Sequence, residues 1–310
     1  MKKPLVIVVV GPTASGKTSL SIELAKRLDG EIVSADSMQI YCDMDIATAK
    51  PDKDEMQGIP HHLIDFLPVG ESFSVARYKE LAMSAVADII KRGKQPIVAG
   101  GTGLYIDTLI NNTEFLDYEE SDLRERLEKR CEAEGVETLF AELAKIDPES
   151  AEKLHINDTK RIIRALEVYY STGKTMSDQR ELSHLNESEY NWCIIGINAE
   201  NRQVLYERIN KRVDLMCEAG LIDEAKEFFS LGCSKTAKQA IGYKELKPYF
   251  DGLVSLEEAL DKLKTETRRY AKRQLTWFRK NEKINWLYID KINKEELTDE
   301  ALRIINSYRS

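Results

Sequence analysis

The chain has 310 residues but only five cysteines, four histidines and three tryptophans. The cysteines form no C-x-x-C pair, which argues against a disulfide framework and against a cysteine zinc site. Among the histidines only His61 and His62 are neighbours, so the spacing of a histidine metal site is absent as well. We therefore expect free thiols in a reducing compartment. They occupy five scattered positions: Cys42, Cys131, Cys193, Cys217 and Cys233.

A long apolar run is also absent. No stretch approaches the roughly 20 apolar residues that cross a bilayer. The apolar segment that follows Met1, Lys2 and Lys3 is too short for a signal peptide. These absences predict a cytoplasmic protein without a membrane partner. A hydrophobic content of 42% is ordinary for a globular chain, and the length allows one large domain or two smaller ones.

Acidic residues outnumber basic ones by 53 to 45, so the net charge is −8, but positive charge is concentrated in one segment. Residues 262–280 carry eight basic residues against the single acid Glu266. Such a stripe can dock on a polyanion, or it can be an ordinary solvated helix face, and charge alone does not separate the two. The basic residues are Lys262, Lys264, Arg268, Arg269, Lys272, Arg273, Arg279 and Lys280.

The most specific motif present is G-x-x-x-x-G-K-T at Gly11–Thr18. It follows the apolar segment Leu5–Val10 and opens a helical pattern that ends near Leu28, which is the setting of a phosphate-binding P-loop. The loop's backbone N–H groups and the helix N-terminus suit a phosphate chain. Lys17 is expected to reach the outer phosphates, and Thr18 to offer a hydroxyl to Mg²⁺. The loop residues are Gly11, Pro12, Thr13, Ala14, Ser15, Gly16, Lys17 and Thr18.

The order of patterns predicts an α/β fold. Apolar segments at 5–10, 31–34, 96–99 and 193–197 predict strands. A helix is expected over 74–91, another begins at Gly103, and later ones span about 202–229, 242–250 and 256–280. Such alternation predicts a P-loop NTPase-like parallel sheet flanked by helices. The charged segment 117–189 lacks strand patterns and predicts an all-helical insertion domain, so the core is expected to comprise 1–116 and 190–310.

Several polar side chains follow the predicted strands, where ligands bind in such folds. Asp36 can bind Mg²⁺ or accept a proton from a nucleophile, or it can cap a turn. Thr102 is the one hydrogen-bonding side chain in the turn Gly100–Gly103. Two arginine pairs, Arg161 with Arg164 and Arg208 with Arg212, each share a helix face and can be either phosphate contacts or surface ion-pair partners.

Taken in order, these segments resemble one family, the tRNA dimethylallyltransferases, over residues 5 to about 286. The matching segments are 11–18, 36–39, 61–65, 100–105, 157–158, 160–167, 172–174, 242–244 and 269–279. The resemblance implies transfer of a dimethylallyl group from dimethylallyl diphosphate to N6 of an adenosine immediately 3′ of the anticodon. In the family the tRNAs concerned read codons beginning with U. The segment His61–Asp65 has no metal-ligand spacing and is expected to be structural or to shape the substrate site near the crevice. Because the chain ends without the zinc finger of eukaryotic relatives, the likeness is to the bacterial form.

The same resemblance implies roles for individual residues. Asp36 is expected to take the N6 proton, with Thr13, Lys17 and Arg212 as further catalytic residues and Arg212 preferred to Arg208 on pyrophosphate. The expected partners are the tRNA anticodon stem-loop and dimethylallyl diphosphate, Mg²⁺ is the expected cofactor, and the protein is expected to be a monomer. The expected tRNA contacts are Asp36, Ser37, Met38, Gln39, Thr102, Arg124, Lys160, Arg161, Ile162, Ile163, Arg164, Gln239, Gly242, Tyr243, Lys244, Lys272, Arg273, Gln274, Trp277 and Arg279.

Competing functions are weaker on the same sequence. An ATP-dependent small-molecule kinase, or an enzyme that prenylates free adenine nucleotide, does not need the basic segment 262–280. A regulatory GTPase needs an N-K-x-D motif, which is absent. No aspartate ends the strand at 96–99, where glycines follow, and this departure disfavours an ATPase.

Overall fold

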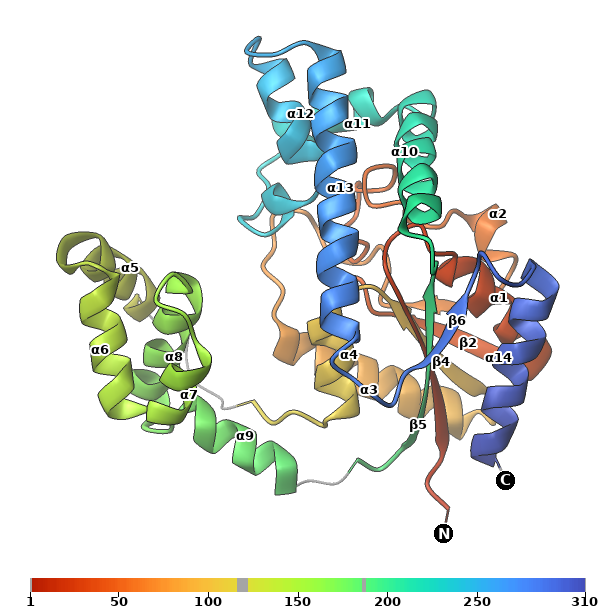
Figure 1. Ribbon diagram of the computed structural model, residues 1–310, viewed down its shortest axis with the longest axis horizontal. Coiled ribbons are helices and arrows are strands. Elements are labelled where there is room, and N and C mark those ends of the chain that lie inside the picture. The colour runs from red at the N-terminus through yellow and green to blue at the C-terminus, as the bar shows by residue number, and fades with distance from the viewer. Residues whose placement is uncertain (1, 116–121, 186–187, 310) are drawn as a thin grey trace. The chain divides into compact units, whose positions relative to one another are not determined.

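The computed structural model describes residues 2–115, 122–185 and 188–309 (Figure 1). The chain divides into two compact units, Met1–Leu109 with Glu189–Ser310, and Ile110–Ser188. The start of the predicted insertion, residue 117, lies outside the described residues. No described helix is long and apolar enough to span a membrane, and all five cysteines are free thiols.

The first unit is built on a parallel sheet with the strand order β3-β2-β4-β1-β5-β6. The central strand β1 pairs with β4 on one side and with β5 on the other, and Val10 lies opposite both Gly100 and Gly196. The loops that follow β1 and β4 therefore emerge side by side. The predicted P-loop NTPase-like sheet flanked by helices is confirmed. The strands are β1 (Leu5–Val10), β2 (Gly30–Ser34), β3 (His61–His62), β4 (Gln95–Gly100), β5 (Asn191–Asn198) and β6 (Asn285–Tyr288).

Helices occupy most of the rest of the described chain. Those that begin in the first unit are α1 (Lys17–Leu28), α2 (Lys53–Met56), α3 (Val75–Lys91), α4 (Gly103–Ile110), α10 (Arg202–Glu218), α11 (Leu221–Ser230), α12 (Tyr243–Phe250), α13 (Leu256–Phe278) and α14 (Lys294–Arg309). Those of the second unit are α5 (Leu123–Glu134), α6 (Val136–Ile146), α7 (Pro148–Lys153), α8 (Thr159–Thr172) and α9 (Met176–Leu185).

Three features of the first unit differ from the sequence prediction. The edge strands β3 and β6 were not predicted, because they have only two and four residues, and the helices α2 and α14 were not predicted either. The helix expected over 202–229 is interrupted at Gly220, whose φ of 103° ends α10 and begins α11. The segment His61–Asp65 supplies the edge strand β3, where His62 Nε2 lies 2.7 Å from a carboxylate oxygen of Glu31.

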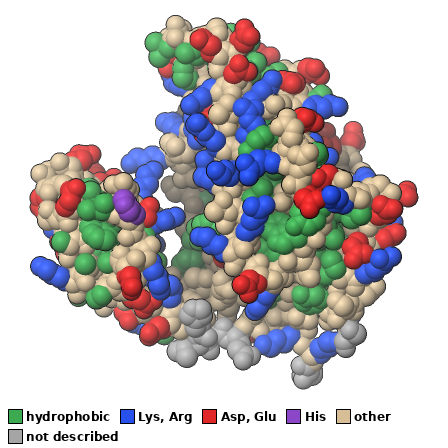
Figure 2. All heavy atoms as spheres, in the orientation of Figure 1, with side chains coloured by type: hydrophobic (Ala, Val, Ile, Leu, Met, Phe, Trp, Pro, Cys, Tyr) green, Lys and Arg blue, Asp and Glu red, His purple; other side chains and the backbone are tan. Residues whose placement is uncertain are grey.

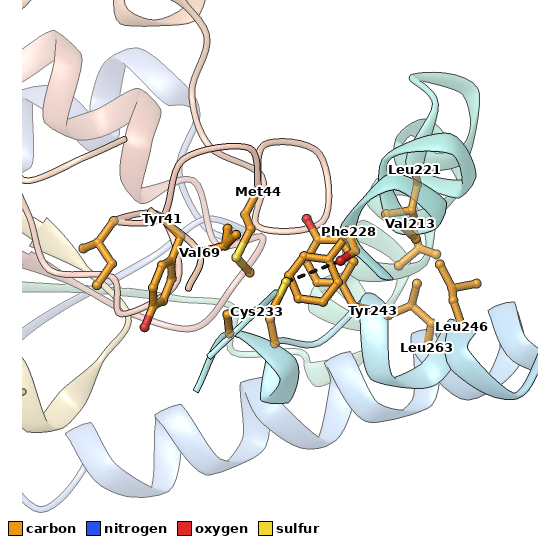
Figure 3. Close-up of a cluster of buried hydrophobic side chains, with 14 of the residues drawn as sticks. Tyr41, Met44, Val69, Val213, Leu221, Phe228, Cys233, Tyr243, Leu246 and Leu263 are labelled. Carbon is orange, nitrogen blue, oxygen red and sulfur yellow. Dashed lines mark hydrogen bonds between the residues drawn. The ribbon is translucent and has the colours of Figure 1, made fainter. Parts of the chain in front are cut away.

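Two cores hold the first unit together. One lies on a face of the sheet, where α1 and α14 bury side chains such as Leu24 and Ile305 against Ile7, Ile97 and Ile195. The helix α3 packs on β2 and β4 with buried side chains outside that cluster, so it covers the other face. The second core lies among α10, α11, α12, α13 and the segment after β2, where Tyr243 stacks on Phe228 at 4.0 Å (Figure 3).

The second unit has a small core of its own. Leu127 of α5, Leu139 and Leu143 of α6, and Ile162 and Leu166 of α8 are almost fully buried against one another. These residues recur at the three- and four-residue spacing of helices, which is why the sequence pattern predicted helices here.

Candidate active site

The phosphate loop follows β1 and requires glycine at its two motif positions. A Cβ on Gly11 would lie 2.3 Å from the carbonyl oxygen of Ile197, and Gly16 has a φ of 98°. A side chain at either position would therefore strain the backbone or clash with it. Lys17 begins α1 and folds back over the loop, where its Nζ donates to the carbonyl oxygen of Pro12 at 2.7 Å. The loop thus collects N–H groups and one ammonium group at a helix N-terminus, the usual setting for a bound phosphate.

A cavity of about 290 Å³ opens beside this loop, and we call it the reaction cavity. It lies entirely within the first unit, and its walls come from the phosphate loop, the segment after β2, and α10, α12 and α13. A second cavity, the outer cavity, shares Lys17, Thr18, Ala49 and Arg212 with it. The predicted site residues that line the reaction cavity are Thr13, Lys17, Thr18, Asp36, Ser37, Met38, Gln39, Arg212, Gln239, Gly242, Lys244, Arg273 and Gln274.

Asp36 caps a turn, which is one of the three roles that the sequence left open. Its Oδ1 accepts hydrogen bonds from the backbone N–H groups of Met38, at 2.9 Å, and Gln39, at 3.3 Å, so it caps a turn. Among the described residues, none donates to its other oxygen, Oδ2, and the residue lines the reaction cavity. The turn therefore fixes the carboxylate while one oxygen is left to accept a proton.

The glycine turn at the end of β4, Gly100–Gly103, helps to fix the position of the Asp36 turn. Thr102 Oγ1 accepts the backbone N–H of Ser37 at 3.0 Å, which fixes the residue next to Asp36. The turn is pressed against α13: a Cβ on Gly101 would lie 2.2 Å from Gln274, and one on Gly103 would lie 2.3 Å from Trp277. Thr102 itself is absent from the lining of the reaction cavity, so in this structure it positions the Asp36 turn.

Two residues predicted as tRNA contacts have packing roles here. Gln274 is 6% exposed; its Nε2 donates to the carbonyl oxygen of Gly101, and its Oε1 accepts the N–H of Thr13. The Trp277 indole donates to Asp107 Oδ2 at 2.7 Å. Gln274 holds α13 onto the loops that follow β1 and β4, and Trp277 holds α13 onto α4. Because Gln274 also lines the reaction cavity, its role as a tRNA contact stays a prediction.

Three other predicted tRNA contacts are core residues, and the structure corrects them. Ile162 and Ile163 are 0% and 4% exposed in the core of the second unit, and Tyr243 is 0% exposed in the second core of the first unit. The helical repeat explains this, since residues adjacent in sequence point to different sides of a helix. Ile162, Ile163 and Tyr243 are therefore buried even though their neighbours in the sequence motifs are charged.

The other predicted contacts in the second unit are cations on α5 and α8. Lys160 and Arg161 are exposed. Arg124 and Arg164 approach the same carboxylate, that of Glu167, at 4.0 and 2.9 Å. On α8, Arg161 and Arg164 share a face that differs from the faces of the buried Ile162 and Ile163. Their role as tRNA contacts stays a prediction.

The cations at the phosphate loop are held at an electrostatic cost. Burial, together with the positive charge of Arg212, lowers the pKa of Lys17 to about 7, although the Asp36 carboxylate opposes the shift. Burial also lowers the pKa of Arg212. Two desolvated cations side by side would be stabilised by an anion between them, and a diphosphate supplies one.

A pH dependence of diphosphate binding follows from Lys17. Above pH 7 the free protein carries a neutral amine, and binding of a diphosphate must restore its proton. Affinity for pyrophosphate is therefore expected to fall by up to about tenfold per pH unit above pH 7.5. Isothermal titration calorimetry at several pH values measures this slope. A Lys17→Arg variant stays charged and should show only the slope of the ligand's own ionisation; equal slopes in the two proteins would contradict the prediction.

Arg208 and Arg212 lie at different parts of the loop. Arg212 lines both cavities, and its Nη2 donates to the carbonyl oxygen of Ala49 at 3.5 Å. Arg208 lines only the outer cavity, and its Nε donates to the carbonyl oxygen of Ala14 at 2.8 Å. The sequence held a signal for this difference, because Arg212 falls within the apolar stripe that Ile209, Val213 and Met216 form on α10.

The wall of the reaction cavity contains a support that the sequence did not reveal. Glu224 of α11 accepts the consecutive N–H groups of Asp45, Ile46 and Ala47 at 2.7–2.9 Å, and the hydroxyl of Tyr243 at 2.8 Å. The segment that it holds continues into Thr48 and Ala49, which line the reaction cavity. Glu224 is thus a positioning residue. It belongs to no motif, and nothing in its local pattern marks it.

Glu224→Gln is expected to loosen this wall. One carboxylate oxygen becomes an NH₂ group that faces backbone N–H groups, so charge-assisted hydrogen bonds are lost. We expect the free energy of unfolding to fall by about 2 kcal/mol and KM for the substrates to rise more than kcat falls. Denaturant unfolding and steady-state kinetics measure both effects. The control is Asp223→Asn, an exposed neighbour with the same charge change; indistinguishable results for the two variants would contradict the role.

The donor atoms near Lys17 suit magnesium. Thr18 and Asp36 both line the reaction cavity, and hydroxyl and carboxylate oxygens are the ligands that Mg²⁺ prefers, with phosphate oxygens and water completing its shell. The described residues contain no group of three or more His, Cys, Asp or Glu side chains that could hold a metal ion. The residues present therefore fit an ion that arrives with a phosphate-bearing ligand.

The fold and the site define a protein with a P-loop-like α/β fold, in which Lys17 and Asp36 line one cavity. Comparison with known proteins narrows the class. A family model described as IPP transferase matches residues 39–281. The chain belongs to this family. A tRNA dimethylallyltransferase of Acetivibrio thermocellus is 53% identical over 294 residues, which is 94% of each chain.

Solved structures agree with this assignment. The tRNA isopentenylpyrophosphate transferase of Bacillus halodurans is 45% identical, with a TM-score of 0.74 over 99% of this chain and 97% of that one. A eukaryotic dimethylallyltransferase, described as acting on tRNA, is 31% identical, with a TM-score of 0.84 over 98% of this chain and 80% of that one.

Proposed function

We propose that this protein transfers the dimethylallyl group of dimethylallyl diphosphate to N6 of the adenosine immediately 3′ of the anticodon, in tRNAs that read codons beginning with U. The products are N6-(dimethylallyl)adenosine and diphosphate. The observation that carries the proposal is that Lys17 and Asp36 line one cavity, in a member of a family whose curated relatives are tRNA dimethylallyltransferases. We propose further that the protein acts as a monomer in the cytoplasm.

The phosphate loop holds the leaving group in this proposal. Backbone N–H groups of residues 11–18, the Lys17 ammonium and the Arg212 guanidinium surround the diphosphate. As the C1–O bond breaks, its electron pair passes to the diphosphate oxygen, and these cations stabilise the charge that develops there. Thr18 and the diphosphate would hold Mg²⁺, which supplies further charge stabilisation when bound. Thr13, which also lines the cavity, would contact the same group.

Asp36 serves the nucleophile. The N6 amino group conjugates with the adenine ring and is a weak nucleophile, so an oxygen that accepts its proton as the N6–C1 bond forms lowers the barrier. Oδ2 has this role, because Oδ1 is committed to the turn. The adenosine must leave its stack to enter the cavity. Gln39 supports the opposite wall, since its Nε2 donates to the carbonyl oxygens of Thr48 and Ala49.

Basic and polar residues in and around the reaction cavity would hold the RNA. Lys and Arg side chains gather over α13 on the face shown in Figure 2. Arg273 lies over the ring of Tyr270, at 5.7 Å from its centroid, and lines the reaction cavity. Lys272 and Arg279 are exposed on the same helix. Together with Gln239, Lys244 and the cations of α8, these groups form the proposed anticodon stem-loop contacts.

A transfer assay tests the proposal. The protein is incubated with Mg²⁺, radiolabelled dimethylallyl diphosphate and an unmodified tRNA that has adenosine next to its anticodon. Label is expected in the RNA and is expected to disappear when that adenosine is replaced. Label in AMP with none in RNA would indicate a free-nucleotide prenyltransferase, and consumption of ATP on a small acceptor would indicate a kinase; either result contradicts the proposal.

A further inference from the structure

A third cavity, of about 340 Å³, lies between the first turns of α10 and the second half of α13, and we call it the α13 cavity. It shares no lining residue with the reaction cavity. On α13 the two cavities use different faces, because Lys272, Thr276 and Arg279 follow one helical stripe while Tyr270 and Gln274 follow another. The proposed chemical step uses no residue of the α13 cavity, although Lys272 and Arg279, which line it, are among the proposed stem-loop contacts.

A buried amide lines this cavity. Asn198 ends β5 and is 3% exposed, and its backbone carbonyl oxygen accepts the N–H of Ile289. The side-chain oxygen Oδ1 is also buried but accepts no hydrogen bond from the described residues. A buried acceptor without a donor is costly, and in native proteins such groups commonly face a ligand or an ordered water. A ligand bound here would therefore be expected to offer a hydrogen-bond donor.

Three cations surround the same cavity. Arg202, Lys272 and Arg279 are exposed, and none forms an ion pair within the described part of the chain. Their situation differs from that of cations nearer the start of α13, where Lys262 and Arg269 pair with Glu266 and Lys264 pairs with Asp214. The acid at the cavity, Glu200, is paired with Lys291. The α13 cavity thus keeps uncompensated positive charge, which favours an anionic ligand.

The remaining lining is apolar and aromatic. Leu205 is 1% exposed, and Tyr206 and Leu275 are half-buried where they pack against the cluster that contains Leu205. A ligand that matches all three features has an anion, a hydroxyl donor and a flat apolar body. A ribonucleotide has these parts, and its 2′-hydroxyl is the donor that distinguishes RNA from DNA.

We propose that the α13 cavity binds one nucleotide of the RNA substrate other than the reacting adenosine. Its phosphate lies among Arg202, Lys272 and Arg279, its 2′-hydroxyl donates to Asn198 Oδ1, and its base packs on Tyr206. The inference rests on the proposed function, because it assumes an RNA substrate. A strand that crosses α13 can reach both cavities, which favours an RNA strand over a free nucleotide as the source of this ribose phosphate.

The first test is the salt dependence of RNA binding, measured by fluorescence anisotropy with the full chain and an anticodon stem-loop in the absence of donor. Arg202→Gln is expected to lower the slope of log Kd against log salt by about 0.7 to 1, the loss of one phosphate contact. The matched control is Lys226→Gln on α11. This variant makes the same charge change at an exposed residue that lines none of the three cavities. An unchanged slope for Arg202→Gln would overturn the proposal.

The second test places the 2′-hydroxyl. Stem-loops with one 2′-deoxy substitution each are bound to the wild type and to Asn198→Ala. At one position other than the reacting adenosine, the 2′-deoxy substitution is expected to weaken binding to the wild type about fivefold. The same substitution is expected to leave binding to Asn198→Ala unchanged. The same penalties in both proteins would overturn the contact. Circular dichroism shows whether Asn198→Ala is folded, and Arg202→Gln provides an independent variant if it is not.

Two further arms separate the alternatives. If AMP binds the free protein and Arg202→Gln weakens AMP but leaves the RNA slope unchanged, the cavity serves a free nucleotide and the RNA assignment is wrong. Failure of the proposed function would give a different result. If RNA binding shows the expected salt slopes and 2′-deoxy effect but no dimethylallyl group is transferred, only the proposed function is contradicted. Normal transfer with unchanged slopes would contradict this inference alone.

Discussion

Asp36→Asn is expected to lower the rate of the transfer step by about 10³-fold, within the range of general base catalysis, while the affinity for RNA stays within about twofold. The amide keeps an oxygen at the position of Oδ1, so the N–H groups of Met38 and Gln39 keep their acceptor. The substitution removes the ability to take the N6 proton, together with the negative charge that acts on Lys17. Single-turnover kinetics with saturating RNA and dimethylallyl diphosphate measure the step directly.

The comparison that isolates this effect is Asp43→Asn. Asp43 is exposed and has a φ of 59°, a conformation that asparagine also tolerates. The variant removes the same charge from the same segment without touching the reaction cavity, and its transfer rate should equal that of the wild type. If Asp36→Asn retained a rate within tenfold of the wild type, Asp36 would only cap its turn, and the base would have to be found elsewhere.

Arg212→Gln is expected to lower turnover about 10²- to 10³-fold, the usual effect of removing one preorganised charge donor, and to weaken pyrophosphate binding. The reason is its place beside Lys17 in both cavities, where lost hydration strengthens its interaction with an anion. Arg208→Gln is expected to cost less than about tenfold, because Arg208 lines the outer cavity and braces the loop through Ala14.

Turnover and pyrophosphate affinity of the two variants, measured side by side, decide which arginine meets the leaving group. A larger loss for Arg208→Gln in both measurements would assign the leaving group to Arg208. A loss of turnover for Arg212→Gln with unchanged pyrophosphate affinity would instead indicate that Arg212 acts through Ala49, whose carbonyl oxygen it contacts. The two arginines lie one helical turn apart on α10. Because each substitution removes one positive charge, each variant controls for the charge change in the other.

The amino-acid sequence by itself determined the phosphate loop and the fold class. Both depend on local patterns. Gly11 and Gly16 are required by backbone geometry within the motif, and the strand β1 before it and the helix α1 after it carry their own periodicity. The sequence also brought Asp36 forward as a candidate, since the residue that ends a strand in such a sheet faces the ligand side.

Only the tertiary structure decided which residues share the site. Glu224 holds the N–H group of Asp45 from 179 positions away, and Thr13 meets Gln274 from 261 positions away. Such pairs leave no trace in local periodicity, because their partners come together through the packing of α11 and α13. For the same reason the sequence could not separate Ile162, Ile163 and Tyr243, which the cores bury, from the exposed cations beside them. Local rules set the backbone of the loop, whereas burial and long-range hydrogen bonds chose the side chains around it.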